Sequence, residues 1–322
     1  MVLRTNTQLN HLIGYAMSSV PAVVIQNVTK RFGTHVAVDD LNLKVPTGSI
    51  YGFIGPNGSG KTTTMRMIMR IIAPDEGHIS VLGVESFDAA NDRVSYLPEE
   101  RGLYRQMKVD ELLRFFAEMK GYKVAEHEIS SWLERMSLTD WAKKKVQTLS
   151  KGMAQKVQFI GTVISKPDLV LLDEPFSGLD PVNAVVLRDA VLDLKKNGAT
   201  VIFSTHDMSV AEKMCDAIFM IYKGKKVLDG TLESIQDQYG SDTVRINGTE
   251  LNTSNIPGVS HVANFGKYQE LRLDPGAELK RIAQHLTNTG TLRHFEVAKP
   301  TLQDIFMRIV GKDVLETEQV GA

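Results

Sequence analysis

The sequence predicts an α/β protein with an antiparallel β part near its N-terminus and a smaller α+β domain at its C-terminal end. Three observations support this fold class. Strand and helix signals alternate from Val23 onward, helical periodicity replaces them between about residues 90 and 165, and the composition shifts after Gly240. We therefore expect a tail over residues 1–20, a main domain over 21–238, a small domain over 240–312 and a second tail over 313–322.

The composition is typical of a folded protein and excludes several other classes. Hydrophobic residues make up 43% of the 322 residues and charged residues 23%, which is enough to bury a substantial core. The formal net charge of −1 argues against a nucleic-acid binder, which usually carries a basic excess. Cys215 is the single cysteine, so no intramolecular disulfide can form, as is usual in a reducing compartment.

The chain is not expected to cross a membrane by itself. No apolar run approaches the ~20 residues that a bilayer-spanning helix needs. The first residues also lack the pattern of a signal peptide. Met17 lies just ahead of the first expected strand and is a candidate translation start, which the intact mass of the natively expressed protein would test.

The elements of the main domain follow from apolar spacing and turn residues. Strands are expected at residues 23–25, 41–45, 50–54, 79–82, 169–172, 200–203 and 217–221. A helix after residue 60 would bury Met65, Ile68, Met69 and Ile72. Two apolar stripes, at residues 112–119 and 153–164, predict core-facing helices in the segment 90–165. Asp180 and Pro181 suit the start of a further helix, and Gly198 suits its end.

In the small domain we expect strands at residues 244–246 and 292–297 and a helix at 278–286. Thr301 is placed to cap a last helix, with Asp304 at the capping-box position. The residues after Asp313 are expected to fray.

A glycine-rich segment follows the buried strand at residues 50–54 and precedes a helix. It fits the pattern G-x-x-x-x-G-K-[ST] and consists of Gly55, Pro56, Asn57, Gly58, Ser59, Gly60, Lys61 and Thr62. Glycines let successive backbone N–H groups point at phosphate oxygens, and the helix adds its positive end. Lys61 would place a charge on the terminal phosphates, and the Thr62 hydroxyl would ligate Mg²⁺.

Polar residues also follow two other apolar strands. Asp173 and Glu174 end the strand that begins at Leu169, and His206 follows the strand at residues 200–204. Ligands of open α/β sheets bind at the carboxyl ends of the strands. Asp173 would hold Mg²⁺ through water, Glu174 would act as general base on the attacking water, and His206 would contact that water and the γ-phosphate.

Together, residues 23 to about 235 resemble the ATP-binding subunits of ABC transporters. The specific element is the peptide Leu149-Ser150-Lys151-Gly152-Met153-Ala154-Gln155-Lys156, which is similar to the family signature LSGGQxQ[RK]. The resemblance implies that Ser150 and Gly152 contact the γ-phosphate of ATP held by the Gly55–Thr63 loop of a second copy. The site would then be complete only in a head-to-tail dimer, with Thr63 at the end of that loop.

The resemblance implies further roles. Phe32 stands where the family places an aromatic residue to stack on adenine, and Asp180 ends a loop that communicates across the dimer interface. Glu99 occupies the place of a glutamine in the family; its carboxylate could still reach Mg²⁺ but adds negative charge near the phosphates. The signature also reads Lys151 and Met153 in place of glycine and glutamine, which we expect to leave function intact.

Two narrower segments, residues 97–104 and 300–306, resemble the subgroup whose partners are ABC-2-type export permeases, including sodium-extruding systems. This resemblance implies a peripheral protein at the cytoplasmic face of the membrane. It would hydrolyse ATP with Mg²⁺, pair with a second ATPase subunit (identical or related) and power a separate permease. Sodium, drug, peptide and lipid cargo all stay open.

Two alternatives belong to other functional classes. A soluble ABC ATPase acting on translation or DNA would usually carry tandem cassettes or long coiled-coil insertions, and this chain shows neither. A regulatory module that binds ATP without hydrolysis is disfavoured by the presence of Lys61, Asp173, Glu174 and His206. A phosphate-release assay separates this last alternative from an ATPase.

Overall fold

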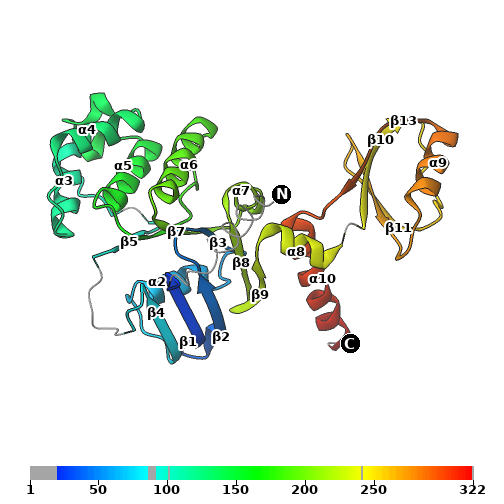
Figure 1. Cartoon of the computed structure of the whole chain (residues 1–322), viewed down its shortest axis with the longest axis horizontal. Helices are drawn as coiled ribbons and strands as arrows, with labels where there is room; N and C mark the ends of the chain where they lie inside the picture. Colours follow the sequence, from blue (N-terminus) through cyan, green and yellow to red (C-terminus); the bar gives the residue numbers. More distant parts are fainter. Residues whose placement is uncertain (1–19, 86–91, 101, 241, 321–322) are drawn as a thin grey trace, which may run out of the picture. The chain divides into compact units, whose positions relative to one another are not determined.

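The computed structural model describes residues 20–85, 92–100, 102–240 and 242–320, so Met17 and residues 1–19 of the expected N-terminal tail lie outside the described residues (Figure 1). The chain divides into two compact units, Met1–Asp229 and Gly230–Ala322. The second unit begins one helix before the boundary expected near residue 240. The reason is that α8 (Leu232–Tyr239) packs on α10 (Leu302–Val320).

The first unit is built around a six-stranded sheet with the order β5-β6-β7-β3-β8-β9, in which the first five strands run parallel. Its strands are β3 (Ile50–Ile54), β5 (Val94–Leu97), β6 (Leu169–Asp173), β7 (Thr200–Thr205), β8 (Ala217–Tyr222) and β9 (Lys225–Gly230). Since β3, β7 and β6 are neighbours, their carboxyl ends lie side by side. This topology confirms the α/β fold class.

Both faces of this sheet are buried, as is typical of parallel sheets. Along β6, Val170 and Leu172 pack with the helices on one face, whereas Leu169 and Leu171 pack with an antiparallel sheet on the other. The alternation explains why β6 reads as a continuous apolar run.

The antiparallel sheet confirms the β part expected near the N-terminus. It has the order β2-β1-β4, with β1 (Val23–Phe32), β2 (His35–Val45) and β4 (Glu76–Val81). The helix α2 (Lys61–Ile68) packs against it through Met65 and Ile68. Met69 and Ile72 were expected on this helix but lie beyond its end, because Arg70 adopts a positive φ of 60°.

Apart from α2, the described helices of the first unit cover the other face of the parallel sheet (Figure 1). They are α3 (Val109–Met119), α4 (Glu126–Arg135), α5 (Lys151–Val163), α6 (Pro181–Lys196) and α7 (Met208–Met214), with 3₁₀ turns at Thr139–Trp141 and Val146–Thr148. The predicted apolar stripe on α5 packs into the core, as do Leu112, Leu113 and Phe116 of the stripe on α3. Met119 was also expected to face the core but is 64% exposed, because it is the last residue of α3. The segment expected to be helical from residue 90 instead begins with β5, a four-residue strand too short to show a period of its own.

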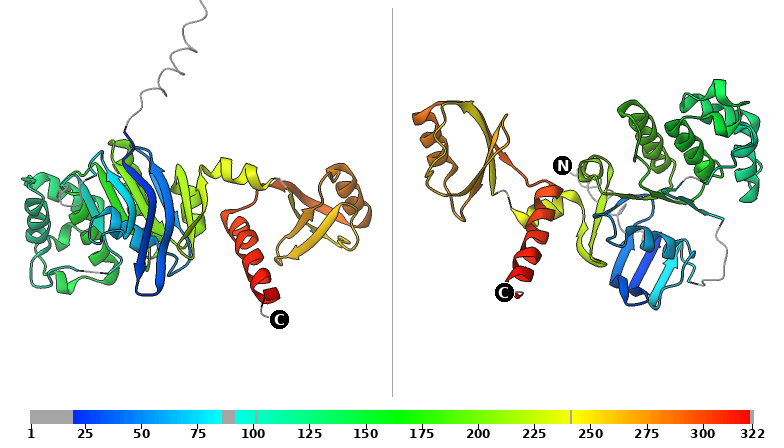
Figure 2. Two further views of the ribbon diagram at one scale, coloured as in Figure 1. Left: turned by 90° about the horizontal axis from the view of Figure 1, so that it is seen from below. Right: turned by 180° about the vertical axis from the view of Figure 1, so that it is seen from behind.

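The second unit contains a four-stranded antiparallel sheet with the order β11-β12-β10-β13 (Figure 2). Its elements are β10 (Thr243–Thr249), β11 (Val259–Asn264), β12 (Gln269–Leu273), α9 (Leu279–Thr289) and β13 (Thr291–Ala298). α9 packs on the face that carries Val244 and Leu271. The hairpin β11–β12 was not predicted, because its strands are short and mostly polar.

The last helix, α10, shows the predicted capping box. The Thr301 N–H donates to Asp304 Oδ2 at 2.9 Å, and the Asp304 N–H donates to Thr301 Oγ1 at 3.2 Å. The expectation of fraying after Asp313 was wrong, since α10 continues to Val320. Among the described helices, none combines the length and the apolar character needed to cross a bilayer.

Candidate functional site

The glycine-rich loop joins β3 to α2 and has no room for side chains at two of its glycines. A Cβ atom on Gly55 would lie 2.2 Å from the Ile221 carbonyl oxygen, and one on Gly60 would lie 2.6 Å from the Ala37 carbonyl oxygen. Gly60 also adopts a φ of 112° as it opens α2. The backbone itself therefore forms the surface that a ligand would meet, as a phosphate-binding loop requires.

Lys61 folds back over this loop. Its Nζ donates to the carbonyl oxygens of Gly55 at 2.7 Å and Pro56 at 3.1 Å, and its side chain is buried. Burial lowers the pKa of the Lys61 ammonium, and the nearby carboxylates, led by Glu174, oppose that shift. The ammonium group is thus held as a buried cation beside the loop, where it can bind an anionic ligand.

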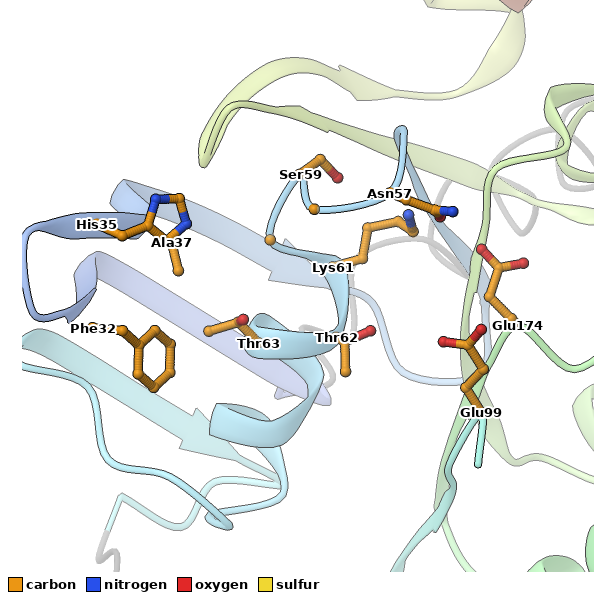
Figure 3. Close-up of a pocket in the computed structure, with 12 residues that line it drawn as sticks. Phe32, His35, Ala37, Asn57, Ser59, Lys61, Thr62, Thr63, Glu99 and Glu174 are labelled. Carbon is orange, nitrogen blue, oxygen red and sulfur yellow. The ribbon is translucent and has the colours of Figure 1, made fainter. Parts of the chain in front are cut away.

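The loop opens into a pocket of about 340 Å³, a size suited to a small-molecule ligand. Figure 3 shows Phe32 and His35 at one end and Lys61, Glu99 and Glu174 at the other. Its lining consists of Phe32, His35, Ala37, Asn57, Gly58, Ser59, Gly60, Lys61, Thr62, Thr63, Glu99 and Glu174. Most of the residues proposed from the sequence therefore meet in one cavity.

His35 and Ala37 line the pocket although the sequence did not single them out. Phe32 and His35 are direct partners in the β1–β2 hairpin, so their side chains share one face. Phe32 is 51% exposed, which leaves its ring free to stack on a planar group. A hairpin interpretation of residues 32–35 would have identified His35, but the sequence alone did not show the register.

Asp173 lies just outside the pocket, at the buried end of β6. Its Oδ1 accepts from Ser204 Oγ at 2.5 Å, and its Oδ2 accepts from the Tyr96 hydroxyl at 3.1 Å. Burial, reinforced by Asp173, raises the pKa of Tyr96, which keeps the phenol protonated as a donor. Both carboxylate oxygens are therefore fixed in position by neighbours on β5 and β7.

Glu174 adopts a positive φ of 47°, a conformation uncommon outside glycine. Its N–H donates to Ser204 Oγ at 2.9 Å, and its Oε1 lies 3.0 Å from Nδ1 of His206. The turn aims a largely buried carboxylate into the pocket, with His206 next to it. Sequence reasoning missed Ser204, which directly follows the apolar residues 201–203 of β7 and connects both acids.

Three other candidate residues lie away from this pocket. Ser150 caps α5 by accepting from the Met153 N–H at 3.3 Å, and Asp180 caps α6. An added Cβ on Gly152 would be in ordinary contact with Leu179, so the two helix starts lie close together. A second cluster is thus formed by Ser150, Gly152 and Asp180. None of these three residues lines the pocket.

The donor set fits Mg²⁺ held together with phosphates. Thr62 and Glu99 line the pocket, and Asp173 lies beside it. Within the part of the chain that the structure describes, no group of three or more His, Cys, Asp or Glu residues could hold a metal by itself. Mg²⁺ usually binds one or two carboxylates plus substrate phosphate oxygens and water, which matches this sparse set.

Comparison with known proteins covers both units. Residues 38–177 match the family described as ABC transporter, and residues 230–310 match the family described as ATP-binding protein DrrA1-3-like, C-terminal domain. The chain is 41% identical over 296 residues to the uncharacterized ABC transporter ATP-binding protein YhaQ of Bacillus subtilis (strain 168), covering 90% of this chain and 98% of the relative.

Two further similarities bear on function and fold. Nod factor export ATP-binding protein I of Burkholderia orbicola is 30% identical over 310 residues, covering 92% of this chain and 99% of the relative. A solved structure, titled "Structure of ATP binding subunit of ABC transporter", aligns with a TM-score of 0.63 and 30% identity, covering 68% of this chain and 93% of that chain.

Proposed function

Since this chain belongs to the family of ABC transporter ATP-binding proteins, we propose that it hydrolyses ATP to drive a separate membrane permease in the export direction. The observation that carries the proposal is the pocket that the phosphate-binding loop and Glu174 line together, with His206 in contact with Glu174. A relative named for Nod factor export, similar over nearly its whole length, supports export. Sodium or a drug are the cargo classes we propose to test first.

In this proposal ATP lies along the pocket, with its base on Phe32 and its phosphates on the loop from Gly55 to Thr63. The loop N–H groups and the start of α2 would hold the phosphates, and Lys61 would place its charge on the terminal ones. Mg²⁺ would supply positive charge that offsets the negative charge of the phosphates during the reaction. The Thr62 hydroxyl, Glu99 and, through water, Asp173 would hold the metal.

Glu174 is the proposed general base. Water would attack the γ-phosphorus, its proton would pass to the Glu174 carboxylate, and the bond from phosphorus to the ADP oxygen would break. His206 would orient the same water, since its Nδ1 contacts Glu174 Oε1. Ser204 would hold Glu174 in the required backbone conformation, because its hydroxyl accepts the Glu174 N–H.

The second cluster, formed by Ser150, Gly152 and Asp180, is proposed to complete the site of another copy. Ser150 Oγ accepts from its own helix, which leaves its O–H available to donate to a phosphate. The start of α5 adds unpaired N–H groups. We therefore propose a head-to-tail dimer, with an identical or a related subunit, held at the cytoplasmic face of the membrane by the permease.

Affinity purification from detergent-solubilised membranes, followed by mass spectrometry, tests the transport proposal. We expect a membrane protein with several spans in stoichiometric yield, and Mg²⁺-dependent phosphate release from the purified complex. A ribosomal or DNA-repair partner without any membrane protein above background would instead support a soluble ATPase. Phosphate release that survives Lys61→Ala would exclude the described pocket as its source.

A further inference from the structure

The second unit carries two rows of polar side chains on one face of its sheet. Thr243, Arg272 and His261 are consecutive cross-strand partners on β10, β12 and β11, so their side chains share a face. Arg245 and Glu270 form the next row on the same face. The alternate residues of these strands, such as Val244 and Leu271, pack on α9, so the polar rows face away from that helix.

The first turns of α10 complete a cavity of about 270 Å³ over this face. Arg308 fixes that helix, since its two terminal nitrogens lie 2.9 and 3.2 Å from the Asp242 carboxylate. The lining comprises Thr243, His261, Ala263, Glu270 and Arg272 of the sheet, and Asp304, Met307 and Arg308 of α10. Every one of these residues belongs to the second unit, so the cavity does not depend on the first.

The charged groups of the cavity are only partly engaged with one another. Arg308 is paired with Asp242, and Arg245 with Glu270 at 2.7 Å. Arg272 Nε lies 3.7 Å from Asp242, beyond hydrogen-bond distance, and its side chain is 44% exposed. Among the residues that the structure describes, the Arg272 guanidinium makes no side-chain hydrogen bond. The same holds for the His261 imidazole and for Oδ1 of Asp304.

The uncommitted groups identify the chemistry of a ligand. A guanidinium fork matches the geometry of a carboxylate, which it can bind through two parallel hydrogen bonds. Asp304 and Glu270 line the same cavity, so a multiply charged anion would meet repulsion there, whereas an ammonium group would be attracted. The volume is below the ~300–1,000 Å³ typical of drug-sized ligands, which favours a small molecule.

We propose that this cavity binds a small zwitterion that carries a carboxylate and an ammonium group, of which free α-amino acids are the simplest class. The carboxylate contacts Arg272, with His261 and Thr243 beside it. The ammonium group contacts the Asp304 carboxylate and the carboxylate oxygen of Glu270 that is not paired with Arg245. The site would give the second unit a ligand of its own, in addition to the ATP bound by the first.

Isothermal titration calorimetry of the full-length protein with each of the twenty standard L-amino acids, one at a time, tests the proposal. We expect at least one to bind with a stoichiometry of one per chain. Arg272→Ala should weaken that binding about tenfold or more, the value expected for losing charged hydrogen bonds. Arg272→Lys keeps the positive charge but lacks the planar guanidinium, so its affinity should lie between those of the wild-type protein and Arg272→Ala.

Two further variants make the test specific. Arg293→Ala removes an exposed arginine from β13, outside the cavity, and should leave the affinity unchanged. Asp304→Asn keeps an oxygen for the helix cap but loses the charge that holds the ammonium group, so binding should weaken. Circular dichroism and unchanged ATP binding would show that each variant is folded.

Three results would overturn the proposal. They are no binding by any of the twenty amino acids, full binding by Arg272→Ala, and equal binding by Asp304→Asn. Inorganic phosphate serves as a control probe. Phosphate that binds and displaces the amino acid from the wild-type protein, with an affinity unaffected by Asp304→Asn, would show a simple anion site in place of a zwitterion site.

Discussion

Replacing Ser204 with alanine removes one hydroxyl that supports both acidic residues of the ATP site. The hydroxyl accepts the Glu174 N–H at 2.9 Å and donates to Asp173 Oδ1 at 2.5 Å, and all three residues are buried. An unsatisfied buried N–H costs about 1–3 kcal/mol, and a hydrogen bond to a charged group contributes about 1.5–3 kcal/mol. The two costs are not fully additive, because both hydrogen bonds involve the same Ser204 oxygen and Asp173 retains its hydrogen bond from the Tyr96 hydroxyl. We therefore expect a net destabilisation of about 2–4 kcal/mol.

Urea unfolding followed by tryptophan fluorescence measures this loss. Both tryptophans, Trp132 and Trp141, lie in the first unit, so the signal reports that unit alone. Linear extrapolation of the free energy of unfolding then compares Ser204→Ala with the wild-type protein. Phosphate release at saturating ATP should fall in parallel, because the backbone of Glu174 loses its anchor.

Ser49→Ala is the matched control. Ser49 is also buried, but its hydroxyl donates only to the neutral Pro46 carbonyl at 2.7 Å, so its loss should cost about 1 kcal/mol. If Ser204→Ala destabilised the first unit no more than Ser49→Ala and left kcat unchanged, the hydroxyl of Ser204 would not support the acidic pair as the geometry indicates.

Four other predictions follow from single side chains. Glu174→Gln should lower kcat about 10²–10⁴-fold while the Kd for ATP is unchanged, as measured by phosphate release and nucleotide binding; a rate above a tenth of wild type would exclude Glu174 as the base. His35→Ala should raise the KM for ATP a few-fold at constant kcat, because His35 lines the end of the pocket beside Phe32; an unchanged KM would place His35 outside the base site. Gly52→Ala should cost about 1–3 kcal/mol, since its Cβ would lie 2.6 Å from Cys215 Sγ, and adding Cys215→Ala should restore most of the loss; an equal cost in the double variant would contradict this contact. Burial raises the pKa of the Cys215 thiol, so iodoacetamide at pH 8 should modify the protein only in denaturant, and rapid labelling of the native chain would show the thiol to be accessible.

The parts of the site that depend on local sequence were predictable. The spacing of the glycines, Lys61 and Thr62 dictates a phosphate-binding loop wherever a strand precedes it and a helix follows. The positions of Glu174 and His206 after two apolar strands also indicated that their side chains would meet, and the structure places them 3.0 Å apart.

The parts that depend on pairing between distant strands were not predictable from one sequence. Ser204 lies beside Asp173 only because β7 pairs with β6 in the observed register. Tyr96 reaches Asp173 from β5, a strand that was assigned to the helical segment because four residues show no clear period. In the second unit the charged cavity arises from the registers of β10, β11 and β12, which no local pattern encodes.

The two ends of the ATP pocket belong to different sheets. Phe32 lies on the antiparallel sheet, whereas the glycine-rich loop follows β3 of the parallel sheet. The two sheets pack against each other through the apolar side chains around α2. A bound nucleotide would therefore act as a crosslink between two layers of the fold. Nucleotide occupancy would then slow amide hydrogen exchange throughout β1 and β2, far beyond the residues that touch the ligand, because opening either layer would require its release.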